Sequence, residues 1–223
     1  MCLIILSWQT HQDHRLIVAA NRDEFHARPA APAAFWRDRP EILAGRDLEA
    51  MGTWMGVSRS GRFAAVTNYR GAREPSAEES RGVLVSRFLG GETGAGAYMA
   101  ELAGRAGHYS GFNLVACDGR ELWWMSNRNG APRRLDAGHH ALGNLLLDSD
   151  DVQDVKRRIA ETPAAVEPLF SVLASAKIVN PQYGTRCSSV LLHSGTDVRY
   201  AERSFAPDGS DGETVHFQFS LQG

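Results

Sequence analysis

The hydrophobic pattern predicts that the chain opens with strands. Two runs rich in large apolar and β-branched residues, Leu3 to Trp8 and Arg15 to Ala20, flank a polar stretch, as in a β-hairpin. A second hairpin is expected from Thr53 to Ser58 and from Arg62 to Asn68. The Pro- and Ala-rich segment from Arg28 to Ala34 is predicted to be a loop. Two hairpins therefore precede the first helical periodicity.

After Ser80 the apolar residues recur at helical spacing on both sides of a Gly-rich break, which predicts a pair of helices. Strands are expected again at Phe112 to Cys117 and Glu121 to Ser126, joined by a tight Asp-Gly turn. Two further helices are predicted, from Asp148 to Ile159 and from Val166 to Ala176. The closing strands are predicted at Ser188 to His193, Val198 to Glu202 and Val215 to Ser220.

This order of elements decides between two fold classes. Strands and helices come in groups, without the strict strand-helix alternation of a parallel doubly wound sheet. An α+β fold is therefore predicted, with two mainly antiparallel sheets packed together and helices on their outer faces. No internal repeat or long linker divides the sequence, so residues 1–223 are expected to form a single domain.

Composition and charge exclude several classes of protein. The apolar fraction of 43% and the charged fraction of 22% are those of a globular protein. The 24 Lys and Arg residues are scattered and are balanced by 26 Asp and Glu, so nucleic acid is not an expected partner. The N-terminal region lacks the pattern of a signal peptide or transmembrane segment, and three cysteines suit a reducing compartment, which predicts a cytoplasmic protein. The oligomeric state is not predicted.

Cys2 is the first candidate for catalytic chemistry. Its small side chain permits removal of Met1, which leaves a thiol and an α-amine on one residue. The ordinary pKa of an α-amine is about 7.7 to 8.0 and that of a thiol about 8.5, so the amine can act as the base for the thiol. Nucleophile and base then come from the same residue. The alternative is that Cys2 is a small buried apolar residue at the start of a strand.

Polar residues gather where predicted strands end. The tetrapeptide Asn21 to Glu24, placed directly after the second strand, combines an amide, a guanidinium and two carboxylates that can orient an amine or bind an anion. A solvated strand end with an ion pair is the alternative. Asn68, Asn144 and Arg186 also stand at strand ends, where an Asn amide can donate to an oxyanion or simply cap a turn.

The sequence does not predict a metal site. His139 and His140 are the only adjacent histidines, and neighbouring residues of a strand point to opposite faces. The cysteines lack the spacing of a zinc site. Cys187 is interpreted as a small core residue, with a reactive thiol as the alternative.

Five segments together resemble one known family. They are ANRDEFHARPAAPAAFW, GTWMGVSRSGRFAAVTNYR, SRGVLVSRFL, GNLLLDS and YGTRCSSVLL, and they extend over most of the chain. In this order they are similar to the successive blocks of the NRDE family, also called the transport and Golgi organisation protein 2 family. The resemblance implies the N-terminal-nucleophile (Ntn) hydrolase fold, a four-layer αββα sandwich.

A more remote similarity is to cysteine Ntn amidases that cleave penicillin V and conjugated bile salts. It implies that Cys2 is the nucleophile, that Asn68 and Asn144 stabilise the oxyanion and position the amine, and that Arg186 is an orienting cation. Those amidases also use an Arg and an Asp after the second strand. The catalytic pair implied here is Arg22 and Asp23.

An ungapped comparison instead places Asn21 and Glu24 at these two positions, and they are the candidate substrate-binding residues. The chain departs from the family pattern at two further positions. Gly143 stands where a Ser commonly precedes the Asn, and Cys187 where a Ser follows the Arg. Neither departure removes a candidate catalytic group.

Two functions follow from the resemblance. In the first, Cys2 attacks the carbonyl of a small linear acyl-amide, and water hydrolyses the acyl-enzyme, with no cofactor required. In the second, the cleft carries a hydrophobic acidic ligand, because family members are implicated in haem trafficking and in lipid or acyl-thioester metabolism. Haem is then a carried ligand, although the sequence has no CxxCH attachment motif.

Overall fold

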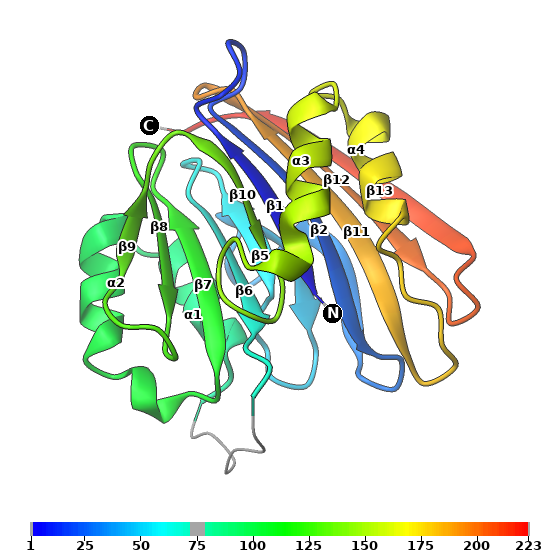
Figure 1. Ribbon diagram of the computed structural model, residues 1–223, viewed down its shortest axis with the longest axis horizontal. Helices are drawn as coiled ribbons and strands as arrows, with labels where there is room; N and C mark the ends of the chain where they lie inside the picture. The colour runs from blue at the N-terminus through cyan, green and yellow to red at the C-terminus, as the bar shows by residue number, and fades with distance from the viewer. Residues whose placement is uncertain (1, 72–78, 223) are drawn as a thin grey trace.

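The computed structural model, which describes residues 2–71 and 79–222, contains two antiparallel sheets that pack face to face (Figure 1). In the first sheet every neighbouring pair of strands is antiparallel. Its order is β10 (Gly138–Leu142), β1 (Leu3–Trp8), β2 (Leu16–Phe25), β11 (Tyr183–His193), β12 (Asp197–Phe205) and β13 (Asp211–Ser220).

The second sheet is built in chain order, each strand pairing with the next. Its strands are β3 (Ala30–Phe35), β4 (Ile42–Asp47), β5 (Met55–Ser58), β6 (Phe63–Asn68), β7 (Phe112–Cys117), β8 (Leu122–Ser126) and β9 (Arg133–Leu135). Short connections are sufficient for such a meander, because antiparallel neighbours need only a turn between them.

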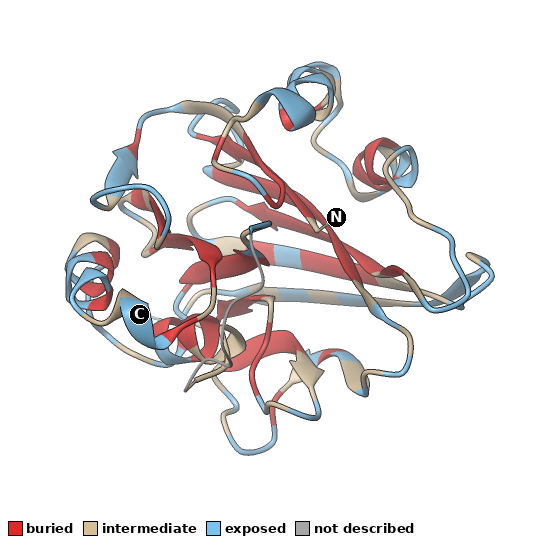
Figure 2. Ribbon diagram, turned by 60° about the horizontal axis from the view of Figure 1, so that its bottom comes forward, coloured by how far each residue is buried: buried red, intermediate tan, exposed pale blue. Residues whose placement is uncertain are grey.

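Helices cover the outer face of each sheet. The second sheet is covered by α1 (Gly82–Leu89) and α2 (Ala95–Ala103), and the first by α3 (Gln153–Glu161) and α4 (Val166–Ala174). Two short 3₁₀ helices, η1 (Ala106–His108) and η2 (Asp150–Val152), complete the elements. Buried strands therefore lie between two layers of helices whose outer sides are exposed (Figure 2). The α+β class and the αββα layers are confirmed. Across the described ranges, no helix combines the length and the apolar character needed to cross a bilayer.

The alternation of side chains along β1 explains its mostly apolar sequence. Ile4 and Leu6 belong to the core between the two sheets, whereas Leu3 and Ile5 pack under α3 and α4. Both faces of this strand are thus buried, so that an apolar run interrupted by Ser7 alone replaces the alternation of a half-exposed strand. Its six residues are all buried.

The prediction of a loop from Arg28 to Ala34 was wrong. Most of that segment forms β3, an edge strand whose pairing with β4 is irregular between Ala31 and Ala34. Pro32 lies in this interval, and a residue without an N–H is tolerated at such an edge. The sequence also did not predict β4, so four strands precede α1 in the second sheet.

The position predicted for the Asn21 to Glu24 tetrapeptide was also wrong. It lies within β2, which continues to Phe25, and does not follow the strand. Pairing with β11 explains the extension, because Asn21 pairs with Ser188 and Glu24 with Gly184. The backbone groups of these polar residues therefore form hydrogen bonds within the sheet, and their side chains alternate between its two faces.

Candidate active site

Cys2 directly precedes β1, at the edge where β1, β2 and β11 reach the same end of the sheet. The last pair of the ladder joins Leu3 to Asn21, so the next residues of β2 run beside Cys2. The Cys2 thiol is partly buried and donates to the backbone carbonyl of Asp23 at 3.4 Å. Strand pairing, and not sequence proximity, therefore brings the thiol to the tetrapeptide.

Two adjoining cavities meet at Cys2, and Asn68 lines both. The larger, of about 330 Å³, is lined by Cys2, Asn68, Arg70, Asn144 and Tyr183. The smaller, of about 120 Å³, is lined by Cys2, Arg22, Asp23, Glu24, Arg28, Asp47, Thr53, Trp54, Val66, Asn68, Ser80, Arg81 and Gly82. Together they form a polar cleft, called here the Cys2 cleft. Six of the eight candidate residues line it.

Asn21 does not line the cleft, because its side chain points to the helical layer. Its amide donates to the carbonyl of Leu173 in α4 at 3.0 Å, and its oxygen accepts from the Ser188 hydroxyl at 2.6 Å. The buried amide thus links the sheet to α4. Asn21 therefore has a structural role in this position. Of the two candidate substrate-binding residues, only Glu24 lines the cleft.

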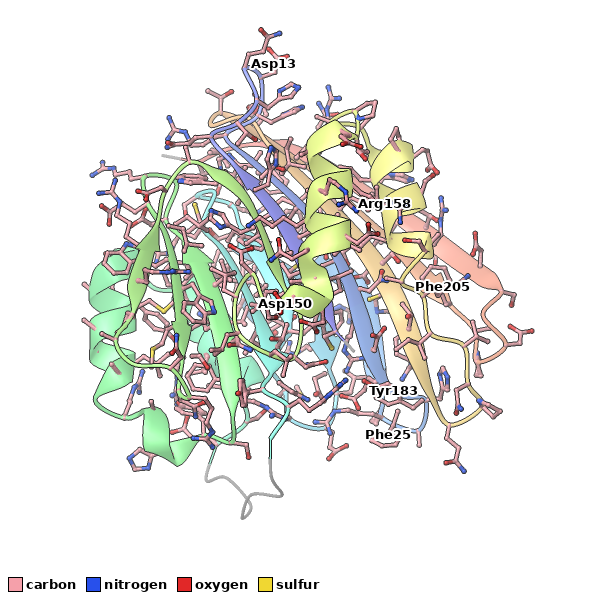
Figure 3. All side chains as sticks on the ribbon, viewed as in Figure 1. Asp13, Phe25, Asp150, Arg158, Tyr183 and Phe205 are labelled. Atoms are coloured by element: carbon pink, nitrogen blue, oxygen red, sulfur yellow. The ribbon has the colours of Figure 1, made fainter. Side chains whose placement is uncertain are left out.

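Asp23 is held by β11. Its Oδ1 accepts from the Thr185 hydroxyl at 2.6 Å, and that hydroxyl oxygen accepts from the amide of Ile178. The Tyr183 hydroxyl donates to the Asp23 carbonyl at 3.3 Å. Figure 3 shows Tyr183 beside Phe25 at this end of the sheet, and their rings meet edge to face. The carboxylate and the carbonyl of Asp23 are therefore both fixed next to Cys2.

The charged side chains of the cleft belong to both sheets. The Arg22 guanidinium lies 4.3 Å from the ring centre of Trp54 and 3.9 Å from the Glu24 carboxylate. Arg28 lies 4.0 Å from the same carboxylate and bonds Asp47 at 2.8 Å. Burial opposes ionisation of Asp47, but the bond from Arg28 and the backbone bonds from Ala50 and Glu49 together outweigh it and lower the pKa of that carboxyl. Charges thus alternate around the cleft.

Asn68 and Asn144 come together although they are far apart in sequence. The Asn144 amide donates to the Asn68 carbonyl at 2.7 Å, and the Asn144 carbonyl accepts from the amide of Arg70. The Thr67 hydroxyl adds a bond to the Gly143 carbonyl at 2.7 Å. Asn144 is therefore committed to holding the end of β6, while the Asn68 side chain is exposed at the cleft.

Arg186 does not line the cleft with Cys2. It lies at an irregularity of β11 between Thr185 and Cys187, and such a bulge re-aims the side chain. The guanidinium donates to the backbone carbonyls of Phe25, His26 and Arg28, at 3.0, 3.3 and 3.1 Å. It lines a neighbouring cavity together with Arg22. Arg186 therefore reaches the Cys2 region only through Arg22 and the turn after β2.

The three cysteines differ mainly in access. Burial, and next the negative charge of Asp23, raise the pKa of the Cys2 thiol, while the bond to the Asp23 backbone acts the other way. Burial raises the pKa of Cys117 to about 12, and burial followed by the charge of Glu202 raises that of Cys187 well above its ordinary value. Cys117 and Cys187 are buried, whereas Cys2 is partly exposed.

Several residues of the Cys2 cleft were not predicted from the sequence. Arg28, Asp47 and Trp54 come from the turn after β2, from the missed strand β4 and from the segment before β5. Tyr183 stands at the start of the segment YGTRCSSVLL, but its type alone gave no signal of function. Burial raises the pKa of Tyr183, so its hydroxyl stays protonated and can donate to Asp23.

Comparison with known proteins gives a family and a fold. The family model of Transport and Golgi organisation 2 matches residues 1–175. The Transport and Golgi organization protein 2 homologs of Bos taurus and Homo sapiens are 31% and 30% identical to this chain, with 100% of each chain covered. A solved Caenorhabditis elegans N-acylethanolamine-hydrolyzing acid amidase ortholog superposes with a TM-score of 0.54, covering 86% of this chain and 92% of that chain. At 12% identity, this likeness concerns the Ntn-hydrolase fold alone.

Proposed function

The chain belongs to the Transport and Golgi organisation 2 family, and we propose that it is an N-terminal-cysteine amidohydrolase that cleaves the C–N bond of a small acyl-amide. The observation that carries this proposal is the convergence of Cys2, Asp23 and Asn68 on one cleft. A thiol, a carboxylate and an exposed amide are the groups that acyl transfer needs at one place.

In the first half-reaction, removal of Met1 leaves a free α-amine on Cys2. That amine takes the thiol proton while Sγ forms a bond with the amide carbon, and the carbonyl electron pair moves to oxygen. Collapse of the tetrahedral intermediate breaks the C–N bond, and the departing amine takes the proton from the α-ammonium. In the second, water cleaves the thioester, which releases a carboxylic acid and restores the thiol.

The neighbouring residues have distinct roles in this scheme. The Asp23 carboxylate, held by Thr185, orients the α-ammonium, and its backbone carbonyl orients the thiol. The Asn68 amide stabilises the oxyanion, and Asn144 positions the end of β6 from which Asn68 extends. Asn144 is thus a positioning residue, because its amide donates to protein backbone.

A carrier of a hydrophobic acidic ligand, such as haem or an acyl thioester, is the second candidate. The presence of Arg22, Arg28 and Arg81 in the lining favours it, because guanidinium groups bind propionate or phosphate. The polar character of the rest of the lining favours the amidase. Both candidate functions use the same cleft. They differ in whether the activity requires the Cys2 sulfur.

The Cys2→Ala variant tests the proposal. Turnover of small acyl-amides is expected to fall by at least about 10³-fold, because the nucleophile acts mainly in the transition state, while substrate affinity changes little. Cys117→Ala is the matched control, because it removes a buried thiol outside the cleft. Intact-mass analysis of protein from its native cell should show loss of Met1. Absence of Cys2-dependent turnover from a broad amide panel, with tight Cys2-independent binding of haem or an acyl thioester, would contradict the amidase and favour the carrier.

A further inference from the structure

A second cavity adjoins the Cys2 cleft on the other side of Arg22 and Trp54, which line both. Its volume is about 210 Å³, and it lies between the ends of β2 and β11 and the edge strand β3. Small side chains from β3, including Ala30 and Pro32, form one wall, and Arg186 forms another. It is called here the arginine cavity.

Arg22 is a buried charge whose donors have no hydrogen-bond acceptor within the described part of the chain. The side chain is only 5% exposed, yet among residues 2–71 and 79–222 it donates no hydrogen bond. Its nearest carboxylate, Glu24, is 3.9 Å away, which is beyond hydrogen-bond distance, and Trp54 offers only its ring face. Burial of a guanidinium without hydrogen bonds is unfavourable, and because Arg22 lines the cavity, its open donors are available to an acceptor that binds there.

Arg186 supplies a second cation that is fixed in place. One of its nitrogens bonds three backbone carbonyls of the turn after β2, which orients the guanidinium. Partial burial, and then the nearby charge of Arg22, lower the pKa of Arg186. The two cations therefore repel each other in the unliganded protein, and an anion between them would relieve that repulsion.

Glu202 does not neutralise these cations. It is the one acidic side chain that lines the arginine cavity in the described ranges, and it is 1% exposed. Its Oε1 accepts from the amide of Ala33 at 2.7 Å, and its Oε2 accepts from the Ser189 hydroxyl at 3.1 Å. Burial also raises the pKa of Glu202, which favours its neutral form. The cavity consequently keeps an excess of positive charge.

We propose that the arginine cavity binds a carboxylate of the substrate through Arg22 and Arg186, and that the amides cleaved at Cys2 are N-acyl amino acids. This inference rests on the proposed function and names its substrate class. Arg22 lines both cavities, so one guanidinium can bind a carboxylate in the arginine cavity while the amide of the same substrate lies in the Cys2 cleft.

A matched pair of substrates tests the charge requirement. N-octanoylglycine and N-octanoylethanolamine share the acyl chain and the amide, and differ in a carboxylate against a hydroxymethyl group. The wild type is expected to prefer the glycine conjugate by about tenfold or more in kcat/KM, as for a charge-assisted bond. Arg22→Gln and Arg186→Gln should bring the ratio close to one, whereas Arg157→Gln, on the exposed face of α3, should retain it. Equal rates for the two substrates in the wild type, or an unchanged ratio in Arg22→Gln, would overturn the proposal.

Binding gives a readout that does not depend on turnover. In a Cys2→Ala background, N-octanoylglycine should bind more tightly than N-octanoylethanolamine, more weakly as salt rises, and about tenfold more weakly after Arg22→Gln. Preferential binding without any hydrolysis by the wild type would support the carboxylate site and contradict the amidase. Cys2-dependent hydrolysis of both amides without preferential binding would support the amidase and overturn the carboxylate site.

Discussion

Two charged clusters lie on the first sheet, and they differ in how their hydrogen bonds are satisfied. At the β10 edge, Asp148 accepts from the amide of Ala141 at 2.9 Å and contacts His140 and Lys156 at 3.1 and 3.0 Å. At the end of β2, the Arg22 side chain is more deeply buried, but it only stacks on the Trp54 ring and lies 3.9 Å from the Glu24 carboxylate. The first cluster closes on itself, whereas the second faces cavities.

The difference separates a structural from a functional use of charge. A cluster whose bonds are complete stabilises the fold, and its loss appears in the free energy of unfolding. A cluster with open donors contributes little to stability, because its desolvation is not repaid until a ligand binds. Variants at the two places are therefore expected to behave in opposite ways, which measurements on Asp148 and Arg22 test, while measurements on Asp23 and Cys2 test the cleft beside Arg22.

Of these four measurements, the largest effect is expected for Asp23→Asn. The amide oxygen still accepts from Thr185, so the fold is retained, but the charge that orients the α-ammonium of Cys2 is lost. The value of kcat should fall by about 10²-fold with a smaller change in KM. Steady-state kinetics on N-octanoylglycine measure this. A change in KM alone would assign Asp23 to substrate binding and not to proton transfer.

The Asp148→Asn variant tests the closed cluster. Burial opposes ionisation, but bonds from His140, Ala141 and Lys156 lower the pKa of Asp148 to about 2. A folded-state pKa below the ordinary value gives a stabilisation that is complete above about pH 4 and is lost as the pH falls towards 2. The variant should lose about 2 kcal/mol of unfolding free energy at pH 7, and the two proteins should converge in acid. Denaturant titrations at several pH values measure it; a loss that is independent of pH would exclude a charge effect.

Alkylation compares Cys2 with the two buried thiols. Cys2 should react about tenfold faster than Cys117 or Cys187, because it is the partly exposed residue of the three. Since burial raises its pKa, the rate should still be rising at about pH 9. Site-resolved mass spectrometry after timed labelling gives all three rates. Faster labelling of Cys187 would instead place the reactive centre in the arginine cavity, and a rate that is already constant at neutral pH would contradict the raised pKa.

The smallest effect is expected for Arg22→Met, which replaces the open charge by an apolar chain of similar length. The unfolding free energy should stay within about 1 kcal/mol of the wild type, because desolvation of the charge was not compensated. The preference for N-octanoylglycine should nevertheless disappear. Thermal and denaturant unfolding provide the measurement. A loss larger than about 2 kcal/mol would show that Arg22 is structural and that the two clusters are alike.

Much of the fold was predictable, because it depends on local periodicity and turns. The helices α1 and α4 and the strands β7, β8 and β12 fall where the pattern places them. The strand β3 was not predictable, because Pro and Ala have low strand propensity and the segment is held by pairing with β4. The extension of β2 was missed for the same reason, since β11 supplies its partners from a distant part of the chain.

The sequence by itself determined the residue types available for chemistry, the αββα class and the family resemblance. Only the tertiary structure decided which of those residues meet. Alternation along β2 sends Asn21 to α4 and Arg22 towards Trp54, and the irregularity in β11 directs Arg186 away from Cys2. The physical reason is that strand register and bulges assign each side chain to a face, and both depend on pairing partners more than 150 residues away.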